Sequence, residues 1–376
     1  MSSCSGAIGH ILFVLTTQMF QDQGAIAERL LCAARDFPRI SLIGRGPLVE
    51  PAKALLARLG LEARSEIIVP PDHAELHGWV QDRFAICEAG ADRERVVVEP
   101  ACGRGGDTAR HAAMASGIAG RDSAGFWFEG GNVLADADDC FLGADIRDRA
   151  QRNGPDRADD AFLDRVANDI ECRRKIHIIG CRAPIKRRGP VRFEIAPGNL
   201  AWRQDVDRSV SWDGSRQPVF HIDMFMTLAG HSPEGRSRVL LGDPIQASAL
   251  IGAPLPDGFP TTAFDEIDAE LRRAGCEVIR NPLPFVYFDD PDSRLREWFY
   301  ASANNCWVER HRTGRGRVWL PEYGFGDWPE LKATDDANAA IWHGLGFDVV
   351  RAGDFLPLVD QLGSLNCVSK ILEREA

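Results

Sequence analysis

A histidine and an aspartate two residues apart form the most chemically suggestive pair in this sequence. His221 and Asp223 lie in the apolar run 220–225 (Phe-His-Ile-Asp-Met-Phe). Side chains alternate between the two faces of a strand, so both ionisable groups would share one face, about 7 Å apart at their Cα atoms. The apolar residues of the run would form the packing face. The run therefore predicts a strand that presents an acid and a base together.

Three further residues have types that would complete a reactive site with this pair. Asp82 ends the segment 79–82 (Trp-Val-Gln-Asp), Glu129 lies in 128–132 (Phe-Glu-Gly-Gly-Asn), and Cys367 lies near the end of the chain. Carboxylates bind a guanidinium through paired hydrogen bonds, because the planar N–H fork matches their two oxygens. A thiolate can attack the central carbon of such a group, and a histidine can protonate the departing nitrogen. The set predicts chemistry on a cationic guanidino group.

These motifs resemble the guanidine-modifying superfamily of α/β propellers, the penteins, and within it the catalytic domain of the peptidylarginine deiminases. Residues 79–82 are similar to the W-x-Q-D motif of that family, and residues 221–225 resemble its H-V-D-x-F motif. Cys367 falls where the family keeps its nucleophile. Motif order and spacing agree with the family over residues 65–372.

The resemblance implies a five-bladed, pseudo-symmetric α/β propeller with a central active-site cavity. It assigns guanidinium binding to Asp82 and Asp223, acid–base work to His221 and nucleophilic attack to Cys367. In the implied reaction the sulfur attacks the guanidino carbon, ammonia leaves, and water releases a ureido product such as citrulline from an S-alkylthiouronium intermediate. Arg104 lies near the position where the family holds an arginine that contacts the substrate backbone.

The sequence also departs from the peptidylarginine deiminases. Its E-G-G-N segment is more similar to that of agmatine and arginine deiminases, whose glutamate lies in the substrate pocket, so Glu129 is an expected substrate-binding residue. Trp79 and Asn132 are also expected to bind substrate. In the animal peptidylarginine enzymes, acidic residues one and three positions after the W-x-Q-D aspartate help to hold calcium. Arg83 and Ala85 occupy those positions here. Calcium needs hard oxygen ligands, so we expect no metal and no cofactor.

Polar residues recur at the starts of five predicted strands, with helical segments between them. These five polar tips are Asp82, Asn132, His221, Asn304 and Cys367. A ring of strand-rich units fits this plan, with each tip turned toward a common centre. Radial repetition of that kind also protects strand edges.

The intervening elements follow from apolar periodicity. Strands are expected at 8–15, 67–69, 239–241 and 347–352. Helices are expected at 25–37, 48–59, 162–170 and 335–345, the last with Thr334 as its N-cap. No linker divides the chain, so residues 1–376 are expected to form one domain, with the charged segment 147–160 as a surface insertion.

Composition narrows the function classes. The chain has 376 residues and a net charge of −11, which disfavours nucleic acid and anionic membranes as partners and favours a cationic ligand. No apolar run is long enough to span a bilayer. The ten cysteines are scattered without a C-x-x-C motif, which favours a reduced, cytoplasmic setting.

The leading hypothesis is a hydrolase that deiminates peptidyl or protein arginine, or a small arginine derivative. One alternative is an agmatine or free-arginine deiminase, and another is an amidinotransferase that passes the amidino group to an amine. A pentein fold used as a binding module without catalysis is a further alternative. Substrate size and oligomeric state stay open at this point.

Overall fold

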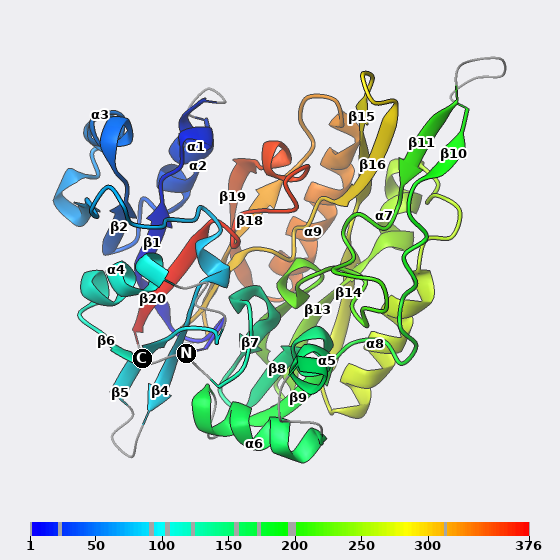
Figure 1. The fold of residues 1–376 in the computed structure, drawn as a ribbon, viewed down its shortest axis with the longest axis horizontal. Coiled ribbons are helices and arrows are strands. Elements are labelled where there is room, and N and C mark those ends of the chain that lie inside the picture. The colour runs from blue at the N-terminus through cyan, green and yellow to red at the C-terminus, as the bar shows by residue number, and fades with distance from the viewer. Residues whose placement is uncertain are drawn as a thin grey trace.

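The computed structural model of the protein (Figure 1) describes residues 2–21, 25–89, 94–101, 106–121, 125–153, 158–170, 174–194, 201–311 and 314–375. Within these residues the chain has an α/β fold built from six separate sheets, none of which closes on itself. The N-terminal strand β1 (Ala7–Val14) pairs antiparallel with the C-terminal strand β20 (Ser369–Glu375), so the two ends of the chain lie side by side.

Five of the six sheets share one plan, in which the first two strands are antiparallel and the next is parallel. The first sheet contains β4 (Ala85–Ala89), β5 (Glu94–Val98) and β6 (Ala119–Arg121). The second contains β7 (Val133–Ala135), β8 (Asp139–Gly143) and β9 (Lys175–Ile179). The third sheet contains β12 (Met226–His231), β13 (Ser237–Asp243) and β14 (Glu277–Pro282). The fourth contains β17 (Trp307–Arg310), β18 (Gly316–Glu322) and β19 (Phe347–Asp354). The fifth is β20, β1, β2 (Arg39–Ile43) and β3 (Ser65–Ile68).

The sixth sheet has a different order and stands apart from that plan. It contains β10 (Val191–Phe193), β11 (Trp202–Asp205), β16 (Leu295–Tyr300) and β15 (Phe285–Asp290). Strands β10 and β11 pair antiparallel, and β11 joins β16 in parallel. The sequence pattern did not predict this sheet.

The helices connect the parallel strands of the sheets, as a parallel crossover requires. They are α1 (Thr17–Gln21), α2 (Ala25–Ala33), α3 (Val49–Leu59), α4 (Gly106–Ser116), α5 (Ala144–Asn153), α6 (Asp159–Asp169), α7 (Pro244–Ile251), α8 (Thr261–Arg273) and α9 (Lys332–Gly344). Helix α8 buries Phe264, Ile267 and Leu271, which lie on one face at helical spacing. They belong to the same hydrophobic core as the buried residues of the β12–β14 sheet. No helix in the described ranges is both long and apolar enough to cross a membrane.

The four predicted helices are all present, with shifted ends. The predicted helix 25–37 ends at Ala33, and α9 begins at Lys332 rather than 335. The predicted N-cap Thr334 is wrong: it lies inside α9, where its hydroxyl donates to the carbonyl of Leu331 at 2.7 Å. The charged segment 147–160 belongs to α5 and the start of α6 where it is described.

The first strands of the five similar sheets all line one central cavity of about 100 Å³. These strands are β4, β7, β12, β17 and β20, and each one follows a polar tip predicted from the sequence. Three tips are 3-10 turns at Val80–Asp82, Gly130–Asn132 and Ile222–Met224. The prediction of a strand over 220–225 was therefore wrong, because the strand begins only at Met226.

An aromatic core fixes the strand that follows Cys367. Phe37 and Trp319 pack edge to face with centroids 4.8 Å apart, and Phe37 also contacts Trp307. The indole Nε1 of Trp307 donates to Ser369 Oγ at 2.7 Å. Strand β17 is thereby tied to the first residue of β20, two positions after the cysteine.

Candidate active site

His221 lies between two carboxylates from different parts of the chain. Its Nε2 is 2.9 Å from Glu129 Oε2, and its Nδ1 is 3.5 Å from Asp82 Oδ1. The side chain is only 4% exposed. Burial disfavours the charged imidazole, but the surrounding carboxylates, Asp82 first, outweigh burial and raise the pKa of His221 to about 9. The ring is therefore held as an imidazolium at neutral pH.

Asp82 and Asp223 provide two carboxylates beside that ring, of which Asp223 is buried and Asp82 is partly buried. The backbone N–H of Gly131 donates to Asp82 Oδ1 at 3.2 Å, and Asn366 Nδ2 donates to Asp223 Oδ2 at 3.0 Å. Asp223 Oδ1 is buried and has no hydrogen-bond partner among the described residues. Burial raises the pKa of Asp223 to about 7, and burial also raises the pKa of Asp82. A bound cation would relieve this desolvation.

Two glycines allow these segments to approach one another. A Cβ atom on Gly131 would lie 2.7 Å from His221 Nδ1 and 2.9 Å from Asp223 Oδ1. A Cβ atom on Gly130 would lie 2.0 Å from the carbonyl oxygen of Gln81. Real Cβ atoms do not come so close to other heavy atoms, so the Gly-Gly pair is a condition for the site to assemble.

Cys367 lies in the turn before β20 and is 3% exposed. Its carbonyl oxygen accepts a hydrogen bond from the N–H of Gln81 at 3.3 Å, next to Asp82 in the chain. Its sulfur lies 3.8 Å from Met224 Sδ. Burial, followed by the charges of Asp223 and Asp82, raises the pKa of the Cys367 thiol well above its usual range. Without a bound cation the sulfur is therefore a neutral thiol.

Asn305 holds the backbone of the turn that carries Cys367, and sequence reasoning missed it. Its Oδ1 accepts hydrogen bonds from the N–H groups of Asn366 at 2.8 Å and Cys367 at 3.1 Å. The residue is fully buried. The predicted fourth tip was its neighbour Asn304, whose side chain instead bonds Asn281 and the carbonyl of Leu240. The Asn-Asn pair was visible in the sequence, but the choice between its members was not.

Asn132, predicted to bind substrate, has its side-chain polar atoms engaged within the protein. Its Oδ1 accepts from the N–H of Ile222 at 3.1 Å and from Gln217 Nε2 at 2.8 Å. Its Nδ2 donates to the carbonyl of Phe220 at 3.1 Å. This geometry favours a role in positioning the His221 turn over direct contact with a substrate.

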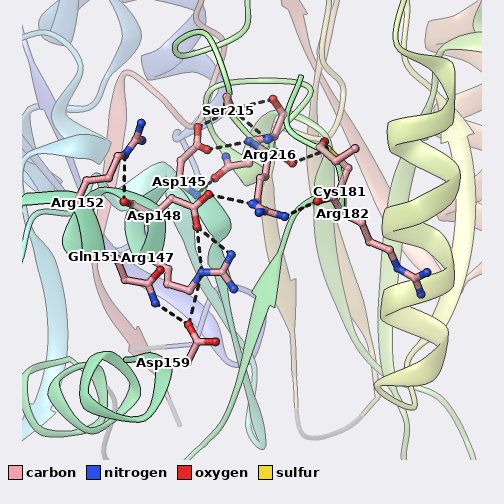
Figure 2. A network of polar contacts seen from close by, with 12 residues as sticks. Asp145, Arg147, Asp148, Gln151, Arg152, Asp159, Cys181, Arg182, Ser215 and Arg216 are labelled. Atoms are coloured by element: carbon pink, nitrogen blue, oxygen red, sulfur yellow. Dashed lines mark hydrogen bonds and ion pairs between the residues drawn. The ribbon is translucent and has the colours of Figure 1, made fainter. Parts of the chain in front are cut away.

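A network of polar contacts joins α5 to the segment that contains Ser215 and Arg216 (Figure 2). Asp145 accepts hydrogen bonds from Ser215 Oγ at 2.7 Å and from the N–H of Arg216 at 3.1 Å. The N–H of Asp145 in turn donates to Gln217 Oε1 at 2.9 Å. Arg216 also pairs with Asp148 at 3.1 Å. Helix α5 thereby fixes the segment that carries Gln217, and through it Asn132.

Trp79 and Arg104 are the two remaining residues that were predicted to contact the substrate. Trp79 is partly exposed and packs its ring over Gly363, where a Cβ atom would lie 2.1 Å from the ring. Arg104 lies outside the described residues, so its contact with substrate stays a prediction.

The positions that correspond to calcium ligands in the animal enzymes do not fit a calcium ion. Arg83 ends the turn that carries Asp82, and Ala85 is a buried residue at the start of β4. Neither side chain offers the oxygen ligands that calcium needs. Among the described residues, no group of three or more His, Cys, Asp or Glu side chains has the geometry to hold a metal.

The chain was compared with known families, curated proteins and solved structures. No family model and no curated protein matches the sequence. A crystal structure of a protein provisionally assigned as a peptidyl-arginine deiminase matches with a TM-score of 0.61 and 11% identity, over 98% of both chains. An X-ray structure provisionally assigned as an agmatine deiminase matches with a TM-score of 0.61 and 15% identity, over 98% of this chain and 94% of the other.

Identities at this level establish the fold and leave the reaction open. Both matches extend over nearly the whole chain, so the likeness covers all six sheets rather than one motif. The α/β fold that the sequence resemblance implied is thereby confirmed, and the five-bladed propeller stays a prediction.

Proposed function

We propose that this protein is a hydrolase that removes ammonia from a guanidino group and leaves a ureido product. Its proposed substrate is peptidyl or protein arginine, or a small arginine derivative. The observation that carries this proposal is the buried imidazolium of His221 between Asp82 and Glu129, in a site where Asp223 and Asp82 also act on the thiol of Cys367. We also propose that the five similar sheets are the blades of a five-bladed, pseudo-symmetric propeller around the central cavity.

Substrate binding is the step that activates the nucleophile. A guanidinium held between Asp82 and Asp223 would place a positive charge beside the sulfur of Cys367. Nearby positive charge lowers a thiol pKa, so the thiol loses its proton to solvent as the substrate enters. The positive charge of the guanidinium thus balances the negative charges of Asp82 and Asp223. The free protein keeps an unreactive thiol.

The first chemical step forms a bond between the Cys367 sulfur and the guanidino carbon. The electrons of the C=N bond move onto nitrogen, and the imidazolium of His221 donates a proton to the nitrogen that departs as ammonia. Glu129 holds Nε2 of the ring at 2.9 Å. This leaves Nδ1, which has no hydrogen-bond partner among the described residues, to deliver the proton.

The second step hydrolyses the thiouronium intermediate. The now neutral His221 takes a proton from water, whose oxygen bonds to the same carbon. The carbon–sulfur bond then breaks, its electron pair goes to the sulfur, and the proton of the new hydroxyl group passes to that sulfur, which restores the neutral thiol. The products are a ureido group, such as that of citrulline, and the original protein with His221 protonated again.

A substrate panel tests this function. The protein would be incubated with a blocked arginine peptide, free arginine and agmatine, and both ammonia and the ureido product would be measured. We expect ammonia release with at least one of them, lost by a factor of at least about 10³ in Cys367→Ser, because no other nucleophile replaces the sulfur. Cys32→Ser, at an exposed cysteine of α2, should keep full activity. Full activity in Cys367→Ser would reject the mechanism.

Two further outcomes separate the alternatives. Product formed only when an amine is added, without free ammonia, would indicate amidino transfer. Failure of Cys367 to react with a haloacetamidine, a guanidine-like electrophile, while the protein remains folded would indicate a binding module.

A further inference from the structure

Lys370 is a buried cation beside the candidate site that the mechanism above does not use. It lies on β20, three residues after Cys367, and is 7% exposed. Its Nζ donates to the carbonyl oxygen of Gln81 at 3.1 Å and lies 5.1 Å from the centre of the Phe84 ring. A Cβ atom on Gly130 would be 3.0 Å from the same Nζ. The ammonium is thus held against the turns that carry Asp82 and Glu129.

Lys370 and Asp223 both line the central cavity. The lysine acts electrostatically on the two carboxylates proposed to hold the guanidinium, those of Asp82 and Asp223, which are called the clamp carboxylates below. Burial lowers the pKa of Lys370 to about 8, while Asp82 and Asp223 favour its charged form. The lysine in turn favours the ionised form of Asp223. The hydrogen bond to Gln81 uses one of its three N–H groups.

The charges that face the two clamp carboxylates come from every element around them. The turn of Asp82 also carries Arg83, the Gly-Gly turn carries Glu129, the third turn carries His221, and β20 carries Lys370. With Asp82, Asp223 and Glu129 ionised, three negative charges face the three positive charges of His221, Lys370 and Arg83. Without the lysine the empty group would hold one uncompensated negative charge.

Buried carboxylates avoid uncompensated charge by binding protons. A protonated Asp82 or Asp223 cannot form a charge-assisted pair with a guanidinium. We propose that Lys370 is a positioning residue that favours the ionised forms of Asp82 and Asp223 in the empty site, so that an incoming guanidinium more often meets two charged carboxylates. This inference rests on the proposed function for its purpose, but its electrostatic content concerns the free protein.

Two substitutions separate the charge from the packing of this side chain. Lys370→Met removes the charge and keeps an unbranched apolar chain, whereas Lys370→Arg keeps the charge. The first measurement is the titration of Asp223 in the free protein, from the ¹³C resonance of its carboxyl carbon, assigned with Asp223→Asn. We expect Lys370→Met to raise the pKa of Asp223 by on the order of 0.5–1 pH unit, and Lys370→Arg to leave it within a few tenths.

The second measurement is the calorimetric affinity for an arginine peptide as a function of pH. In the native protein affinity should fall as the clamp carboxylates are protonated. Lys370→Met should move that fall to higher pH by the same amount. If Lys370→Met does not fold, as judged by thermal unfolding, Lys370→Gln replaces it with the same expectation.

The outcomes distinguish this inference from the proposed function. An Asp223 titration that is the same in the native protein and in the neutral variants overturns the role of Lys370, whatever the substrate is. A shifted titration in a protein that binds no guanidinium ligand supports the electrostatic role and refutes the proposed function.

Discussion

The contact between Glu129 and His221 gives a prediction that can be worked through in numbers. Glu129→Gln keeps a side chain of the same shape, whose amide oxygen can still accept a hydrogen bond from Nε2 across the 2.9 Å contact. It removes one negative charge from the surroundings of the ring. The variant should therefore lower the pKa of His221 with little change in geometry.

The size of this effect follows from the pKa of His221. Its rise from 6.5 to about 9 corresponds to roughly 3 kcal/mol of preference for the charged ring, at about 1.4 kcal/mol for each pH unit. Three carboxylates supply this preference and also overcome burial. An equal share for Glu129 is then at least about 1 kcal/mol, or roughly 0.7–1 pH unit.

The assay is ammonia release at saturating substrate, measured from about pH 6 to about pH 10.5, because kcat reports groups in the substrate complex. The proposed mechanism needs His221 protonated, so activity should fall on the basic side. We expect Glu129→Gln to move this basic limb down by roughly one pH unit. Glu62→Gln, at an exposed glutamate, should leave it in place.

An unmoved basic limb with a lower kcat would refute this reasoning. Glu129 would then act on the substrate directly rather than through the charge of His221. A basic limb that moves upward would contradict the sign of the electrostatic argument itself.

Two further predictions concern the assembly of the site, and a third concerns its independence of calcium. Gly131→Ala should destabilise the protein by about 1–3 kcal/mol in urea unfolding and reduce activity by more than about tenfold, because the new methyl group meets His221 and Asp223; Gly120→Ala, with nothing within 4 Å, should do neither. Asn305→Ala should cost about 1–3 kcal/mol and lower kcat, since two backbone N–H groups lose their acceptor; an unchanged unfolding curve would argue against this role. Calcium and a chelator such as EDTA should each leave activity unchanged, and activation by calcium above about twofold would show that other residues bind it.

The sequence alone was enough to propose the candidate site residues and their order. Asp82, His221, Asp223 and Cys367 each lie in a short motif whose chemistry can be read without a structure, and the structure brings their segments together. The α/β fold and the five polar tips before the inner strands also followed from the order of apolar runs. Local information suffices where a motif carries its chemistry in a few adjacent residues.

Local conformation at the tips was harder to predict, because tertiary contacts replace strand pairing there. The run 220–225 has the alternation and composition of a strand. Its backbone is instead held as a turn, since the N–H of Ile222 donates to Asn132 Oδ1, 90 residues away in the chain. Thr334 shows the same effect at a helix end, where the preceding turn lets α9 begin earlier.

The supporting residues were decided by the tertiary structure alone. Asn305 meets Cys367 from the turn before β17, and Lys370 reaches the carbonyl of Gln81 across 289 residues of sequence. The electrostatics of the site were equally hidden, because the shifted pKa values of His221 and Asp223 arise from burial beside charges that the chain brings in from distant segments. A sequence names the titratable groups, but only the folded arrangement sets their distance from water and from one another.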